Sequence, residues 1–180
     1  MRKNIICFHA WILNPLLNLF PIFWIDIFYD NQTYIGNTLD HPLYLILWSF
    51  SSALGFYFYS KKIWDSSHVP YPKKTFFFLC LGMCLSCWIP YSNQLPTWIN
   101  DFHVWMAIIC VSGFIYLWIR PFFFHSLFYM MHQKQLHILY MIFFLCLCSM
   151  IAPGHITSLC EILFSFGVNA YLAYWSLYKA

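Results

Sequence analysis

Long apolar stretches alternate with short polar breaks along this chain. A helix that spans a bilayer needs roughly 20 predominantly apolar residues, within a range of about 17–25. Six stretches approach this description, and each is apolar on all sides, which is typical of helices that face lipid. They cover Ile5–Phe28, Pro42–Tyr59, Thr75–Trp88, Phe102–Ile119, Leu136–Ile151 and Thr157–Tyr178. The pattern predicts an all-α integral membrane bundle of six transmembrane helices, forming a single transmembrane domain over residues 1–180.

The composition excludes most soluble classes of protein. Hydrophobic residues make up 62% of the 180 residues and charged residues 8%, whereas soluble domains have about 45–50% and about 25%. A soluble fold of this size cannot bury so many apolar side chains, because most of its residues reach the surface. A secreted disulfide scaffold, a disordered chain and a nucleic-acid-binding domain are therefore excluded, and we expect no nucleic-acid partner.

The basic residues predict the orientation of the bundle. All nine fall in the two chain ends or in segments 60–74 and 120–135, and none falls in 29–41, 89–101 or 152–156. Because cytoplasmic loops are enriched in Lys and Arg, both termini are predicted to be cytoplasmic. The net charge of +3 then favours anionic lipids of the inner leaflet as partners. The nine are Arg2, Lys3, Lys61, Lys62, Lys73, Lys74, Arg120, Lys134 and Lys179.

The N-terminal segment resembles a signal peptide in part. Arg2 and Lys3 precede an apolar run, but no small-residue cleavage site follows and the run continues to Phe28. We therefore expect a retained helix. Low Ala and Gly usage with abundant Phe, Ile, Tyr, Asn and Lys is typical of an AT-rich bacterium. The predicted location is the bacterial cytoplasmic membrane, which the chain crosses several times.

Carboxylates and imidazoles gather on the predicted outer side. Asp101 and His103 are the candidate catalytic pair, with His103 as a general base or metal ligand. Asp101, His41, Asp40 or Glu161 would orient it or complete a metal site. Ionisable groups at membrane depth are costly and mark functional sites. The candidate binding residues of the same cluster are Asp26, Asp40, His41, His155 and Glu161.

Two interpretations of this outer cluster remain open. Imidazole and carboxylate together suit zinc or a similar divalent ion, which would activate water. No spacing in the chain is a metal signature, however, so the identity of any metal stays unknown. Alternatively, outer loops are simply polar, and Asp40 and Asp101 precede helices where Asp is a favourable N-cap.

Two further groups of residues stand inside predicted helices. His9, Asn14 and Asn18 recur at roughly helical spacing, and buried polar groups in a membrane helix need partners. We expect their face to point into the bundle, for helix–helix hydrogen bonds or for a substrate path. Cys84 and Cys87 form a Cys-x-x-Cys pair, but the predicted outer loops hold no second, exposed pair. A structural role as small apolar residues is therefore favoured over thiol redox chemistry.

Short motifs carry a resemblance to a known family. Tyr34-Ile35-Gly36-Asn37-Thr38 is followed by Pro42 and Trp48-Ser49-Phe50, and Asp101-Phe102-His103 opens a later predicted helix. These elements resemble the six-helix family of damage-regulated autophagy modulators, their relatives in GPI-anchor lipid remodelling, and small bacterial homologues. Gly36 and Asn37 replace the family's Ser and acidic residue, and His103 lacks the usual following Asn. The resemblance implies a lipid-related role, with the first outer loop approaching His103.

Three functions follow as hypotheses. The first is a lipid-handling protein, either an enzyme that uses the outer cluster centred on Asp101 and His103 or a non-enzymatic one, with membrane lipids as partners. The second is the substrate-binding membrane subunit of a vitamin-like uptake system, which needs partner membrane subunits and a separate ATPase because the chain has no Walker A motif. The third is a non-catalytic membrane organiser.

Overall fold

The computed structural model describes residues 3–92 and 94–178, and these residues form helices joined by short loops. The first helix covers Lys3–Phe23 as α1 (Lys3–Phe8), a π-helical turn (His9–Leu13), α2 (Asn14–Leu19) and a 3-10 turn (Phe20–Phe23). The middle of the chain forms α3 (Gln32–Asn37), α4 (Pro42–Ser66), α5 (Lys73–Trp88), α6 (Thr97–Phe124), α7 (Ser126–Met131) and α8 (Gln133–Ile151). The last helix consists of α9 (Ser158–Ile162), a second π-helical turn (Leu163–Val168) and α10 (Asn169–Tyr178).

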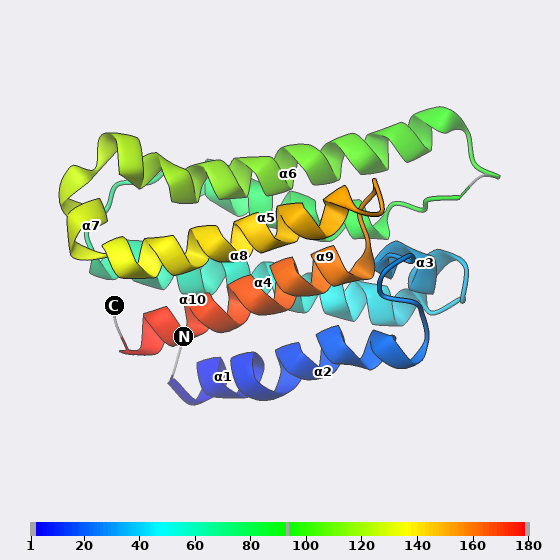
Figure 1. Cartoon of the computed structure of the whole chain (residues 1–180), viewed down its shortest axis with the longest axis horizontal. Coiled ribbons are helices and arrows are strands. Elements are labelled where there is room, and N and C mark those ends of the chain that lie inside the picture. The colour runs from blue at the N-terminus through cyan, green and yellow to red at the C-terminus, as the bar shows by residue number, and fades with distance from the viewer. Residues whose placement is uncertain (1–2, 93, 179–180) are drawn as a thin grey trace.

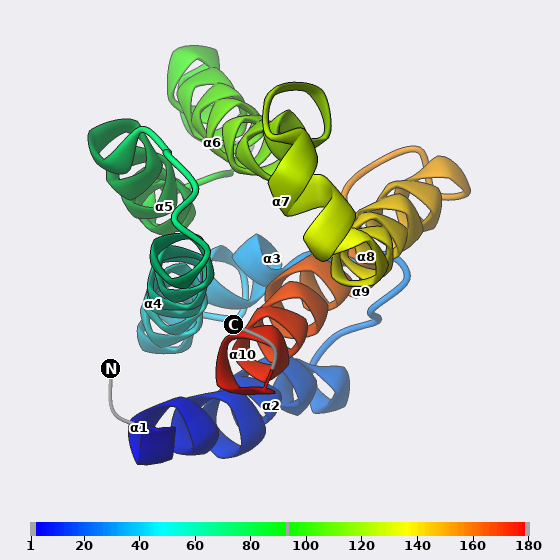
Figure 2. The same cartoon turned by 90° about the vertical axis from the view of Figure 1, so that its left-hand side faces the viewer.

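The long helices run side by side along the long axis of the molecule (Figure 1). Seen from the end, α4 lies between α5 and α10, while α6 flanks α5 (Figure 2). The first helix packs against α4 and α10, and α8 packs against the last helix. The short helix α3 packs against α4. α4 therefore contacts α5 as well as the first and last helices.

Within the described residues, three helices are long and apolar enough to cross a membrane: Lys3–Phe23, Thr97–Phe124 and Gln133–Ile151. The other three predicted spans also lie on helices, but these helices do not meet the same criterion. α5 has 16 residues, about 24 Å at a rise of about 1.5 Å per residue, which is shorter than a bilayer core of about 30 Å. α4 carries Ser49, Ser51 and Ser52 within its apolar stretch, and these lower its hydropathy.

The predicted helix boundaries were wrong at several ends. The first helix stops at Phe23 rather than Phe28, because Pro21 has no N–H to continue the helix and opens a 3-10 turn. α4 extends past Tyr59 to Ser66, and α6 covers Thr97–Phe124 rather than residues 102–119. Hydropathy marks the part of a helix that is apolar, whereas hydrogen bonding continues into charged turns at either end.

Aromatic side chains form much of the buried core. The rings of Phe56, Phe114 and Phe164 come from three helices, with centroid separations of 5.1 to 6.1 Å. Trp64 and Trp118 continue this packing at 4.8 Å. Tilted and edge-to-face arrangements at these separations are the favourable geometries for aromatic pairs.

The described basic residues gather at one end of the bundle. This end contains the start of the first helix, the α4–α5 connection and the α6–α8 connection (Figure 1). The ammonium of Lys3 lies 5.8 Å from the ring centroid of Tyr178, so the beginning of the first helix and the end of the last helix are neighbours. Arg2 and Lys179, which belong to the same predicted set, lie outside the described residues.

Candidate functional site

The loop that follows the first helix (residues 24–31) is hydrogen-bonded to the start of the last helix, at the end of the bundle opposite the basic residues. The backbone N–H of Ser158 donates to the carbonyl of Asp30 at 2.6 Å, and that of Leu159 donates to Ile27 at 2.9 Å. The first N–H groups of a helix have no intrahelical partner, so the loop supplies the missing acceptors. This contact places Glu161 beside Gln32, whose backbone N–H donates to Glu161 Oε2 at 2.6 Å.

Glu161 belongs to a partly buried polar group that we call the Glu161 joint, formed by Gln32, Tyr44, Ser158 and Glu161. The Tyr44 hydroxyl donates to Leu17 O at 2.6 Å and lies 3.0 Å from Gln32 Oε1. Gln32 Nε2 and Ser158 Oγ are buried without a hydrogen-bond partner among the described residues. The joint therefore holds a carboxylate acceptor and an amide donor with unused hydrogen-bonding capacity.

From this joint a row of buried polar side chains continues between the first helix, α4 and the last helix. Asn18 Oδ1 accepts from Trp48 Nε1 at 2.9 Å and from the hydroxyl of Ser165. Asn18 Nδ2 donates to Asn14 Oδ1 at 2.8 Å. Each of these bonds joins two helices or two turns of one helix, so the polar groups fix how the three helices meet.

The row ends around Gly55 of α4, which Asn169 and His9 approach closely. Asn169 Nδ2 donates to the carbonyl of Ser52 at 3.1 Å. The His9 ring nitrogens lie 2.6 Å from the Tyr59 hydroxyl and 2.9 Å from Ser51 Oγ. We call the whole row the polar seam; it contains His9, Asn14, Asn18, Ser51, Ser52, Tyr59, Ser165 and Asn169, all of them buried.

Hydrogen bonding within the polar seam is incomplete among the described residues. Asn14 Nδ2, Ser52 Oγ and Asn169 Oδ1 are buried without a partner among the described residues. Both π-helical turns lie on this seam, one beginning at His9 and the other containing Ser165. π-helical turns occur frequently at functional sites, and unpaired buried polar atoms are groups with which an ordered water or a ligand atom pairs.

The candidate catalytic pair lies on α6. Asp101 is exposed in the early part of the helix. His103 is half-buried, its Nδ1 donates to the carbonyl of Ile89 at 3.0 Å, and its ring centroid lies 5.4 Å from that of Tyr91. The Asn37 amide donates to Tyr91 O at 3.2 Å, so α3 and His103 contact the same segment.

The remaining cluster residues are distributed over several loops. Asp26 is exposed and accepts a hydrogen bond from Phe28 N. Asp40 is exposed, and His41 stacks on Trp24 at 4.8 Å between ring centroids. His155 Nε2 donates to the carbonyl of Tyr29 at 2.9 Å. The alternative role as N-caps was wrong for both aspartates, because the N-cap position is occupied by His41 in α4 and by Pro96 in α6.

The structure brings the cluster together only in part. The loop that carries Asp26 contacts the segment of His155 and Glu161 through the backbone bonds described above. Within residues 3–92 and 94–178, no three His, Cys, Asp or Glu side chains are arranged to hold a metal ion. The catalytic and binding roles of the seven residues remain predictions.

The sequence analysis identified some residues of the Glu161 joint and the polar seam and missed others. His9, Asn14 and Asn18 were expected to face the bundle, and their burial confirms this. Gln32 and Asn169 were not singled out, although an amide inside an otherwise apolar stretch, as at Asn169, was a usable signal. Gln32 gave no such signal, because it lies in a loop-rich polar segment. The cysteines are free thiols, and Cys80 and Cys84 are buried in α5.

Comparison with known proteins adds no relative: no family model, no curated protein and no solved structure matches this chain.

Proposed function

We propose that the chain is a six-span membrane protein with both termini in the cytoplasm, and that it binds a phospholipid through the Glu161 joint. Large apolar side chains such as Leu16, Ile109 and Phe144 are exposed on three different helices, and a bilayer is the environment that accommodates such surface. The basic residues at one end and the proximity of Lys3 to Tyr178 support an even number of crossings and a cytoplasmic position for that end.

The observation that carries the lipid proposal is the unused hydrogen-bonding capacity beside Glu161. A carboxylate oxygen accepts hydrogen bonds from an ammonium group, while the free Nε2 of Gln32 donates to an oxygen. A head group with both features is a phosphoethanolamine, and its acyl chains would lie along the exposed apolar helices. The resemblance to lipid-remodelling proteins points to the same class of ligand.

Thermal unfolding of the detergent-purified chain tests this proposal with two matched lipids. Phosphatidylethanolamine carries N–H donors, whereas phosphatidylcholine has the same charge without them. We expect the first lipid to raise the melting temperature more than the second. The Glu161→Gln variant should lose this preference, with an affinity lower by about ten- to a hundredfold, because a charge-assisted hydrogen bond is worth about 1.5–3 kcal/mol.

Asp101→Asn is the control, since it neutralises an exposed carboxylate on α6. It should keep the preference for phosphatidylethanolamine. Loss of the preference in Asp101→Asn but not in Glu161→Gln would locate the lipid-binding site at Asp101 and His103 instead. An equal response to both lipids in all three proteins would contradict lipid recognition and favour the membrane-organiser hypothesis.

A second candidate function is passage of a small polar molecule along the polar seam, as an uptake subunit with partner subunits would require. The unpaired Ser52 Oγ and Asn169 Oδ1 favour it, since water at these atoms would continue the row of polar groups. Proton permeability of liposomes containing a trapped pH dye is the simplest probe. A hydrated path predicts a leak in the wild-type chain that Asn18→Leu reduces.

A further inference from the structure

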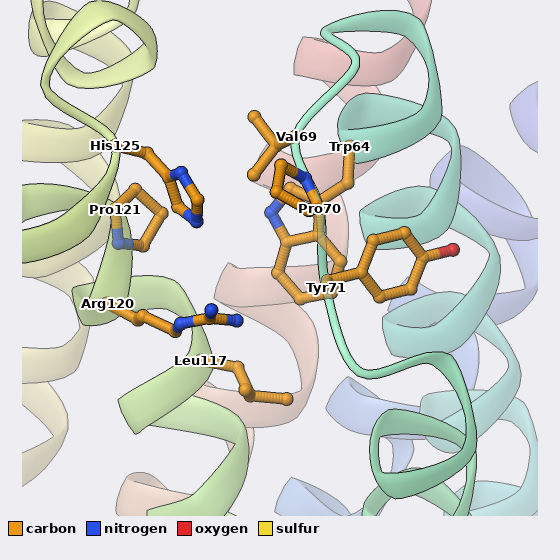
Figure 3. Close-up of a pocket in the computed structure, with 8 residues that line it drawn as sticks. All are labelled: Trp64, Val69, Pro70, Tyr71, Leu117, Arg120, Pro121 and His125. Atoms are coloured by element: carbon orange, nitrogen blue, oxygen red, sulfur yellow. The ribbon is translucent and has the colours of Figure 1, made fainter.

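A small cavity lies at the basic end of the bundle, between the end of α6 and the connection from α4 to α5 (Figure 3). Its volume is about 10 Å³, which is close to the minimum of about 10–15 Å³ that accommodates one water-sized group. Arg120 and His125 on one wall are half-buried, and Pro70 on the other is exposed. The cavity is therefore close to the surface, and the helix ends surround it.

Three nitrogen-bearing side chains point into this cavity. Figure 3 shows the Arg120 guanidinium, the His125 ring and the indole nitrogen of Trp64 facing the same space. Trp64 is 1% exposed, and neither its Nε1 nor His125 Nε2 has a hydrogen-bond partner among the described residues. An indole N–H is only a donor, so a buried one without an acceptor is unfavourable.

The charge of Arg120 is also unbalanced. Asp65 is the one acidic residue in segments 60–74 and 120–135, which hold six basic residues. Its carboxylate accepts a hydrogen bond from the Tyr71 hydroxyl at 3.2 Å, and Figure 3 shows that hydroxyl pointing away from the cavity. Burial and the neighbouring Asp65 raise the pKa of Tyr71 to about 12, so Tyr71 remains a neutral donor. Asp65 thus bonds to Tyr71, and none of the eight residues that line the cavity carries a carboxylate.

We propose that Arg120, Trp64 and His125 form a phosphate-binding site at the basic end of the bundle. One phosphate oxygen would occupy the cavity and accept from the indole N–H and the imidazole, while the guanidinium pairs with a second oxygen outside it. Arg binds phosphate through planar, paired hydrogen bonds. This site is separate from the Glu161 joint, and it does not depend on the function proposed for that joint.

The phosphate belongs either to a lipid head group or to a free ion. Thermal unfolding of the full detergent-purified chain distinguishes the two sources with three additions: phosphatidic acid, inorganic phosphate, and diacylglycerol as the phosphate-free lipid. We expect phosphatidic acid to raise the melting temperature and diacylglycerol to leave it unchanged. Arg120→Gln should need about tenfold more phosphatidic acid for the same shift, since a charged hydrogen bond is lost.

Lys134→Gln is the matched control, because it removes one positive charge from an exposed residue at the same end and should bind as the wild type does. Arg120→Lys keeps the charge without the planar geometry and should give an intermediate affinity. Trp64→Phe removes the N–H while keeping an aromatic ring, and it should also weaken binding. A response to inorganic phosphate equal to that for phosphatidic acid assigns the site to the free ion. Identical responses of Arg120→Gln and Lys134→Gln, or no response to either phosphate compound, would overturn the proposal and leave a single water in the cavity.

Discussion

The two halves of the bundle are held together by different means. Between the first helix, α4 and the last helix, amides, hydroxyls and an imidazole bond across the helices beside apolar core residues such as Ile6 and Leu172. Between α4, α5 and α6, they are made mainly by aromatic rings and other apolar side chains. α4 serves both halves, since Gly55 faces Asn169 and its neighbour Phe56 packs against Phe114.

This difference illustrates two ways in which helices pack in lipid, where the hydrophobic effect does not drive their association. In lipid, apolar side chains gain little by leaving their surroundings, so dispersion and shape hold the aromatic half together. Hydrogen bonds in the polar half have fixed partners and directions, and they set the register of three helices. Hydrogen bonds in membrane proteins contribute about 0.6 kcal/mol each on average. We therefore expect the aromatic half to dominate stability and the polar half to determine geometry.

The largest effect is expected from Phe114→Ala in the aromatic half. Phe114 is fully buried and contacts the rings of Phe56, Phe76 and Phe164. Its removal leaves a cavity, and such changes cost about 3–5 kcal/mol in soluble proteins. We expect about 3 kcal/mol in detergent or lipid, measured as the loss of unfolding free energy by steric trapping. A cost below about 1 kcal/mol would show that the aromatic half does not dominate.

The next effect is expected from Gly55→Ala, where the polar half is most tightly packed. A Cβ at residue 55 would overlap Asn169 Oδ1, lie 2.8 Å from Asn169 Cγ and 3.0 Å from His9 Cε1. Overpacking of this kind costs about 1–3 kcal/mol. Gly167→Ala is the control, since its new Cβ would meet Ile142 at an ordinary 3.4 Å. The melting temperatures of the two variants are measured in the same detergent. Equal decreases for Gly55→Ala and Gly167→Ala would contradict close packing of Asn169 against Gly55.

The smallest effect is expected from Asn18→Leu, which tests the polar seam alone. The change keeps the number and branching of the side-chain heavy atoms but removes the acceptor of Trp48 Nε1 and of the Ser165 hydroxyl. We expect a cost of about 0.6–2 kcal/mol, the range for interhelical hydrogen bonds in membranes. A double-mutant cycle with Ser165→Ala isolates the shared bond, and a coupling energy of zero would show that the two residues act independently.

The sequence by itself determined much of this molecule. Apolar stretches located all the long helices, because a helix in lipid must be apolar over most of its length. The burial of His9, Asn14 and Asn18 followed from their helical spacing, since a polar face in lipid needs a partner. The ends of the helices were not determined in this way, because turns at Lys61, Lys62 and Arg120 continue hydrogen bonding beyond the apolar stretch.

The tertiary structure alone decided which polar groups meet. Glu161 and Gln32 are 129 residues apart along the chain, and only the contact of the loop with the last helix places them at 2.6 Å. Asp101 and His103, two residues apart in sequence, remain on α6 with separate surroundings. Hydropathy is the sum of the free energies of transfer of the individual residues from water to lipid, and these depend only on residue type, which the sequence specifies. Pairing depends on which helices are neighbours and how each is rotated about its axis, and these follow from side-chain packing across the whole bundle.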